Sequence, residues 1–253
     1  MEGAGTRPDE VACRRLARRE VLGWSLATTV LTLIGQRGVA AAQAARGTVY
    51  VFPLIDIRPH VLQRSMQGAL PGFEVTVFGR VGDFKNAIET SRPDAIITLA
   101  PVLEYLGFTP QLQGVMGGVT DEKYLLVSER PIEASALPSL TIGCIDLVGR
   151  RELAPFVARV LGLPREPVVE RVTKLEDLVR LLQFRRADTV LVPARFLDGL
   201  RAGTQMQINV LDLPTARVRR TAIAFPGDRT AIEAALRALP REVKDRLGVD
   251  AWQ

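Results

Sequence analysis

Four arginines stand directly after runs of β-branched and apolar residues, where a strand ends and a helix begins. They are Arg58, Arg150, Arg151 and Arg195. A guanidinium is a planar fork of donors that matches a carboxylate or a phosphate. In sheets built from strand-helix units, ligands lie beyond the carboxyl ends of the strands, where helix N-termini also offer free N–H groups. We therefore predict a binding site for a small anionic molecule that uses these arginines.

Two further side chains complete the predicted ligand-binding site. Thr98 stands near the end of a strand and offers a hydroxyl, and His60 follows Pro59 at a helix start. For all six residues, a position on the surface or in the core without ligand contact stays an alternative. The chain holds 29 arginines and four lysines, so arginine is its default surface cation. Strand threonines are often half-buried, and His60 also suits an ordinary first helical turn.

The strand ends define four segments that we expect to face the ligand. They are 53–60, 100–103, 146–151 and 193–196. Each leads from a predicted strand towards a predicted helix, so the partial positive charge of a helix N-terminus points to the same edge of the sheet.

Motifs for catalysis and for metal binding are missing from the sequence. The single histidine, His60, rules out the H-E-x-x-H pattern, and neither C-x-x-C, G-x-S-x-G nor G-x-G-x-x-G occurs. The glycines between Gly114 and Gly118 lack the Lys-Ser/Thr of a phosphate loop, so we interpret them as a turn or a hinge. We predict that the protein is not an enzyme and has no metal and no cofactor; an exported enzyme is the alternative.

The first half of the chain alternates between strand and helix patterns. A strand is expected at 48–55, a helix at 59–70, a strand at 73–79, a helix at 83–90 and a strand at 94–100. Such alternation predicts a parallel sheet covered by helices and connected by right-handed crossovers.

A glycine-rich segment at 107–120 then interrupts the pattern, and we interpret it as a connector that is too rich in glycine for a core strand. A second series follows, which suggests a second lobe. It comes after a strand expected at 123–128, and it has expected strands at 140–146, 168–172 and 188–192 and expected helices at 152–161 and 175–182. The end of the chain adds expected strands at 208–213 and 219–225 and expected helices at 232–239 and 243–247.

The N-terminal segment has the order basic, apolar, small. Arg18 and Arg19 precede an uncharged stretch at 21–36, and Ala42-Gln43-Ala44 fits a signal-peptidase site. The most apolar part, 21–34, is shorter than a membrane span. We predict that residues 1–44 are a cleaved twin-arginine signal peptide and that the protein is periplasmic. An uncleaved membrane anchor is the alternative.

Removal of this leader would change the net charge and the number of cysteines. Residues 45–253 carry 27 Lys and Arg against 24 Asp and Glu, a net charge of +3 in place of +5. No aromatic residues interleave with the remaining basic pairs, so we predict no nucleic-acid partner. One cysteine remains, Cys144, which we expect to be a small buried residue in a strand.

Two segments carry a resemblance to a known family. Residues 178–200 (LVRLLQFRRADTVLVPARFLDGL) and 236–252 (LRALPREVKDRLGVDAW) resemble stretches of type II periplasmic solute-binding proteins, especially phosphate- and phosphonate-binding members of ABC transporters. The segment 146–151 lacks the Ser/Thr-rich anion loop of the phosphonate binders. The type I class is the alternative within the superfamily.

The resemblance implies an α/β fold with two Rossmann-like lobes, whose mixed, mostly parallel sheets are joined by hinge strands. Lobe 1 would comprise 45–127 and 217–253, and lobe 2 would comprise 128–216. It also implies a monomeric solute-binding protein that closes around its ligand and presents it to an ABC transporter permease in the inner membrane. A sensor-input domain or an orphan binding domain is the alternative function.

Overall fold

The first strand shows why the alternating pattern produces a sheet. The computed structural model describes residues 47–54 and 57–253, so the predicted leader lies outside the described residues. In β1 (Thr48–Phe52), Val49 and Val51 are fully buried on one face, and Tyr50 lies on the other. Successive side chains of a strand point to opposite faces, so each face can pack against its own layer of helices.

The first sheet has six strands in the order β12-β4-β11-β3-β1-β2. Its parallel part consists of β2, β1 and β3, as the strand-helix alternation predicts. The other three strands pair antiparallel. The bounds are β2 (Glu74–Val77), β3 (Ala95–Leu99), β4 (Leu112–Val115), β11 (Thr221–Ala224) and β12 (Ala251–Trp252).

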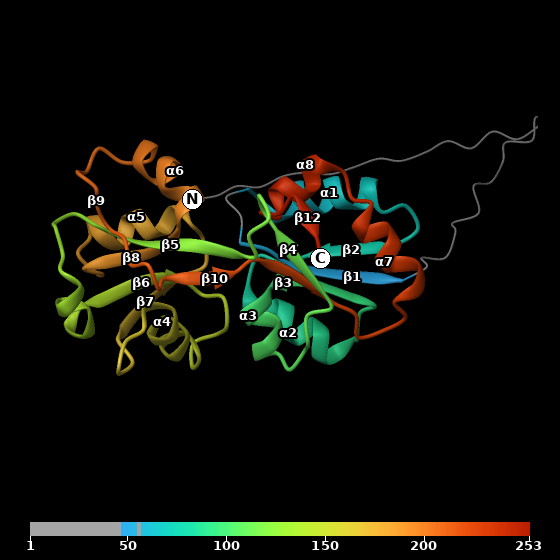
Figure 1. Cartoon of the computed structure of the whole chain (residues 1–253), viewed down its shortest axis with the longest axis horizontal. Helices are drawn as coiled ribbons and strands as arrows, with labels where there is room; N and C mark the ends of the chain where they lie inside the picture. The colour runs from blue at the N-terminus through green and yellow to red at the C-terminus, as the bar shows by residue number, and fades with distance from the viewer. Residues whose placement is uncertain (1–46, 55–56) are drawn as a thin grey trace, which may run out of the picture. The chain divides into compact units, whose positions relative to one another are not determined.

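Helices cover both faces of this sheet (Figure 1). Leu62 and Met66 form the buried stripe of α1 (Pro59–Ala69) and pack in one apolar cluster with α7 (Thr230–Arg237) and α8 (Arg241–Arg246). Side chains of α2 (Val81–Thr90) and α3 (Ala100–Tyr105) belong to a different cluster on the other face. The spacing of apolar residues predicts α1, α2, α7 and α8, whereas α3 is too short for a periodic signal.

The second sheet has the strand order β10-β5-β8-β6-β7, with β9 also paired to β5. Its parallel part is β7, β6 and β8, and its other pairs are antiparallel. Helix α4 covers one face, and α5 and α6 cover the other. The bounds are β5 (Asp121–Ser128), β6 (Thr141–Ile145), β7 (Val168–Val172), β8 (Thr189–Pro193), β9 (Asn209–Leu211), β10 (Arg217–Arg219), α4 (Leu153–Leu161), α5 (Glu176–Gln183) and α6 (Leu197–Ala202).

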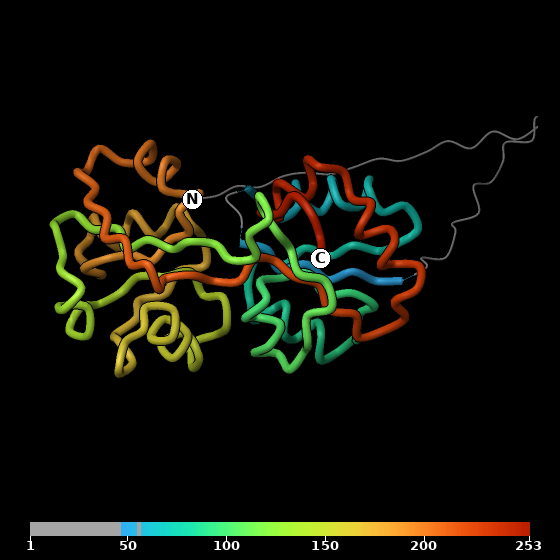
Figure 2. Tube along the Cα trace, viewed as in Figure 1, coloured from blue at the N-terminus to red at the C-terminus, as the bar shows by residue number. Residues whose placement is uncertain are grey.

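We call the first sheet with its helices lobe 1 and the second sheet with its helices lobe 2. Two adjacent segments connect the lobes (Figure 2), and the backbone N–H of Arg220 donates to the carbonyl oxygen of Thr120 at 2.8 Å. The division at 127/128 and 216/217 stays a prediction. Because β5 and β10 pair within the second sheet, the strand pairing favours boundaries near 120 and 220.

One apolar core cluster includes residues of both lobes. Phe52 and Phe84 of lobe 1 belong to it, as do Leu147 and Val148 of lobe 2. The lobes are also joined by Lys85, whose Nζ donates to the carbonyl oxygen of Val148 at 2.7 Å. The described residues lie within one compact unit by their contacts.

The glycine-rich segment contains a strand that the sequence interpretation missed. Strand β4 lies between β11 and β12, although we expected a connector without a core strand. A Cβ atom on Gly114 would collide with the side chain of Val249 and the backbone carbonyl of Thr221. Glycine at this position therefore permits close packing. Gly117 and Gly118 form the turn that follows, both with positive φ (58° and 80°), as the turn interpretation expects.

We predict that Gly114→Ala lowers the free energy of unfolding by about 2 kcal/mol, since overpacking a tight core has this order of cost. Gly68→Ala is the matched control: Gly68 lies in α1, and an added Cβ meets nothing within 4 Å. That substitution should raise stability by about 0.5–1 kcal/mol. Urea denaturation followed by circular dichroism measures both. Equal effects of the two substitutions would contradict the packing argument.

Candidate functional site

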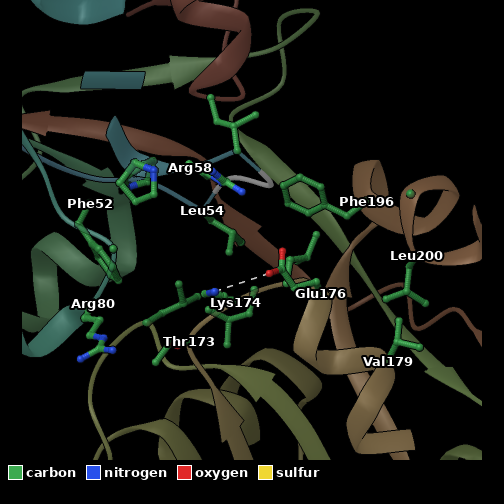
Figure 3. A pocket seen from close by; sticks show the side chains of 18 of the residues that line it. Phe52, Leu54, Arg58, Arg80, Thr173, Lys174, Glu176, Val179, Phe196 and Leu200 are labelled. Atoms are coloured by element: carbon green, nitrogen blue, oxygen red, sulfur yellow. Dashed lines mark ion pairs between the residues drawn. The ribbon is translucent and has the colours of Figure 1, made fainter. Parts of the chain in front are cut away.

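A cavity of about 910 Å³ lies where the carboxyl ends of strands from both lobes meet (Figure 3). Lobe 1 contributes the segments after β1 and β2. Lobe 2 contributes residues after β6 and β7 and the start of the region after β8. Its lining residues are Phe52, Pro53, Leu54, Ile57, Arg58, Pro59, Phe78, Gly79, Arg80, Asp83, Ile145, Leu147, Thr173, Lys174, Leu175, Glu176, Val179, Arg180, Gln183, Phe196, Gly199, Leu200 and Gly203.

Three helices begin at this cavity. Arg58 is the N-cap residue of α1, Arg80 that of α2 and Leu175 that of α5. None of the three caps makes a side-chain hydrogen bond to its helix. Uncapped helix N-termini carry a partial positive charge and free N–H donors, so all three favour an anion in the cavity.

The charged side chains of the cavity divide unequally between the lobes. In lobe 2, Lys174 Nζ lies 3.7 Å from a carboxylate oxygen of Glu176, and Arg180 pairs with Asp177 at 3.1 Å. Within the described part of the chain, neither Arg58 nor Arg80 of lobe 1 has a carboxylate oxygen within 4.0 Å of its guanidinium nitrogens. Lobe 1 therefore supplies the cationic groups that a ligand can neutralise.

Arg58 is the one predicted site residue that lines this cavity. His60 is exposed in the first turn of α1 and does not line it. Thr98 is 1% exposed in β3, and its Oγ1 has no hydrogen-bond partner among the described residues. Burial in the middle of the sheet keeps Thr98 out of the cavity.

Arg150 and Arg151 are exposed and lie outside the cavity lining. The reason is the conformation of the segment after β6. One oxygen of Asp146 accepts from the N–H of Gly149 at 2.8 Å, and the other pairs with Arg171 at 2.7 Å. This tight turn buries Leu147 and Val148 and directs the following residues to the surface.

Arg195 does not line the cavity, because its guanidinium binds other groups of the protein. Its Nη1 donates to the carboxylate of Glu122, and its Nη2 donates to the carbonyl oxygen of Leu54 at 2.9 Å. Its guanidinium also lies 4.5 Å from the ring centroid of Phe196. Leu54 belongs to lobe 1 and Phe196 to lobe 2, so this side chain joins the two walls of the cavity.

The sequence interpretation missed the walls formed after β2 and β7. Arg80, Thr173 and Lys174 follow these strands, and the strand-end argument that found Arg58 applies equally to them. The expected segment 100–103 lies within α3 instead. Its residues Ala100, Val102 and Leu103 are fully buried, so they serve the core.

Buried groups with reactive chemistry are few in the described residues. Cys144 is buried in β6, which confirms the sequence expectation. Burial raises the pKa of its thiol and also the pKa of the Tyr124 hydroxyl. A thiol held protonated is a poor nucleophile. Residues 47–54 and 57–253 contain no group of three His, Cys, Asp or Glu side chains arranged to hold a metal, and no helix with the length and apolar character of a membrane span.

Solved structures share this architecture at low sequence identity. A Xanthomonas citri protein bound to ATP has a TM-score of 0.55 and 14% identity, over 81% of this chain and 90% of that chain. The substrate-binding protein of an amino acid ABC transporter has a TM-score of 0.50 and 15% identity, over 80% and 92%.

The GluR0 ligand-binding core from Nostoc punctiforme, in complex with L-glutamate, has a TM-score of 0.50 and 16% identity, over 75% of this chain and 91% of that chain. No protein-family model and no curated protein sequence matches this chain. The chain has the two-lobe α/β fold with mixed sheets of the type II periplasmic binding proteins, which confirms the predicted fold class. The expectation of mostly parallel sheets was wrong, because four of the ten strand pairs are parallel and six are antiparallel.

We predict that Arg195→Ala lowers the free energy of unfolding by about 2 kcal/mol. The Glu122 carboxylate is 4% exposed, and removal of one partner from a buried ion pair leaves a charge poorly compensated. Arg220, whose Nη1 lies 3.8 Å from Glu122 Oε1, retains part of the compensation. Chemical denaturation measures the change.

Arg201→Ala is the matched control for this prediction. Arg201 pairs with Asp198 at the surface, where ion pairs contribute little, so a change below about 0.5 kcal/mol is expected. If Arg195→Ala lowers the free energy of unfolding no more than Arg201→Ala does, the buried pair does not stabilise the arrangement of the lobes.

Proposed function

We propose that this protein is an exported solute-binding protein that holds a small anionic ligand in the cavity between its lobes without converting it. The observation that carries the proposal is the position of the cavity. It lies at the carboxyl ends of strands from both lobes, where closure of the lobes would enclose a ligand.

The charge of the cavity supports an anionic ligand. Its lining holds four basic and two acidic side chains, a surplus of two positive charges. Arg58 and Arg80 extend from the two helix starts of lobe 1, so side-chain charge and helix polarity act in the same direction.

We further propose that residues 1–44 direct export to the periplasm by the twin-arginine route. The support is the Arg18-Arg19 pair, the apolar stretch that follows and the Ala-Gln-Ala end. A folded two-lobe protein with a buried core that includes residues of both lobes is a suitable cargo for a route that carries folded chains.

The proposed partner is an ABC transporter permease in the inner membrane, which would receive the ligand from a monomeric protein. The similarity to the binding protein of an amino acid transporter supports this partner. A sensor-input role is the second candidate, and the similarity to the GluR0 core favours it. The turn at Asp146, with Leu147 and Val148 buried, offers no hydroxyl cradle, so it does not favour phosphonate as the ligand.

We predict that an anion raises the melting temperature of the mature protein in a thermal-shift screen of anions and nutrients, because binding to the folded state alone stabilises it. The hit should be recovered unchanged after incubation. Conversion of the hit would indicate an enzyme, and the absence of any shift across a broad nutrient screen would contradict ligand binding.

Arg58→Ala should weaken binding of this ligand more than tenfold, which corresponds to about 1.4 kcal/mol. Arg64→Ala is the matched control, because Arg64 lies exposed on the same helix outside the cavity. Isothermal titration calorimetry measures both affinities. A loss of affinity in Arg150→Ala that Arg58→Ala lacks would place the ligand at the segment after β6 instead.

Substitution of Arg18 and Arg19 by lysine should abolish export of a reporter fused to residues 1–44. The twin-arginine route reads the guanidinium pair, whereas a general secretory signal accepts any positive charge. Fractionation of the cells into periplasm and cytoplasm measures the reporter. Continued export of the lysine variant would assign the leader to another route.

A further inference from the structure

The side chains that line the cavity indicate more about the ligand than the net charge of the cavity does. Three phenylalanines line it: Phe52 and Phe78 from lobe 1, and Phe196 from lobe 2. Phe52 stacks on Phe84, with ring centroids 5.3 Å apart and planes at 27°. Phe78 meets Tyr50 edge to face at 5.3 Å. These rings are held by their neighbours, so the cavity presents fixed aromatic surface.

Aliphatic side chains extend this apolar surface in both lobes. Figure 3 shows Leu54 close to Arg58, and Phe196, Val179 and Leu200 on the lobe 2 side. The remaining aliphatic members of the lining are Ile57, Ile145, Leu147 and Leu175. Such surface gains free energy when an apolar group displaces water from it, and it offers no donors to a compact polar ion.

The cationic groups of the lining come from both lobes: Arg58 and Arg80 from lobe 1, and Lys174 and Arg180 from lobe 2. Arg58 lies near Leu54 in Figure 3, whereas Lys174 extends towards Glu176. Lys174 is already paired, and no described carboxylate lies within ion-pairing distance of Arg58. Among the described residues, a ligand thus meets two guanidinium groups without a carboxylate partner, those of Arg58 and Arg80, beside apolar walls.

In the described arrangement of the lobes, the cavity is much larger than a small ion. Pockets for drug-sized ligands span about 300–1,000 Å³, and 910 Å³ falls near the upper end. An inorganic oxyanion would leave most of this volume to water against apolar walls. An amino acid would bring an ammonium group into a lining with a positive surplus, where Glu176 already has a cationic partner. The other lining carboxylate, Asp83, lies exposed in the first turn of α2.

We propose that the ligand is an organic anion with a bulky apolar body, of the aromatic or branched-chain carboxylate class. This inference rests on the proposed function and names the ligand class for the same cavity. The carboxylate pairs with Arg58, and the apolar body lies against Phe52, Leu54 and Phe196.

The test is isothermal titration calorimetry of the mature protein with a matched set of compounds. 3-Phenylpropionate and 4-methylpentanoate carry both features. 3-Phenylpropanol lacks the charge, acetate lacks the apolar body, and phenylalanine adds an ammonium. Inorganic phosphate and methylphosphonate represent the oxyanions. We expect the first two to bind at least tenfold more tightly than the others.

Variants of the protein test which side chains contact the ligand. Arg58→Gln should weaken 3-phenylpropionate more than tenfold and leave the weak binding of 3-phenylpropanol unchanged, while Arg64→Gln should change neither. Phe196→Leu, which keeps a large apolar side chain in the core, should weaken 3-phenylpropionate more than it weakens acetate. Circular dichroism of each variant confirms its fold.

The outcomes separate this inference from the proposed function. Tighter binding of phosphate, methylphosphonate or phenylalanine that depends on Arg58 overturns the ligand class and leaves a binding protein with an anion site. Absence of binding by both apolar carboxylates also overturns the ligand class, and the broad thermal-shift screen then decides the proposed function by itself.

Discussion

One buried carboxylate, that of Glu122 at the start of β5, lies where the two lobes connect. Arg195 of lobe 2 donates to it, and Arg220, where the chain returns to lobe 1, lies 3.8 Å away. Arg195 also reaches the carbonyl oxygen of Leu54 across the lobes. A buried charge must be compensated, so Arg195 and Arg220 both stay close to Glu122. These contacts join the segments that connect the lobes to the cavity wall at Leu54.

The cavity results from the arrangement of the two lobes together with the topology of their sheets. In each lobe, three parallel strands direct their carboxyl ends and the following helix starts towards the same edge. The walls differ, because Arg58 and Arg80 of lobe 1 lack carboxylate partners among the described residues, whereas Lys174 and Arg180 of lobe 2 are paired. Leu147 belongs to the apolar core that includes both lobes and also lines the cavity.

Local patterns predicted most elements because burial on one face imposes a period of 2 on strands and 3.6 on helices. β1, α1 and α4 follow their expected ranges closely. The pattern failed at β4, where Gly114 is required by the approach of Val249 and Thr221. A glycine that permits contact between distant segments looks the same in sequence as a glycine in a loop.

The sequence alone determined the class of fold and several of the strand ends that line the cavity, since these depend on local order and composition. The tertiary structure decided which arginines can meet a ligand. Arg58 lines the cavity, Arg195 is neutralised by Glu122, and Arg150 is turned outward by the Asp146 turn. Glu122 is 73 residues away from Arg195 in the chain, so no local pattern reveals that this guanidinium is paired.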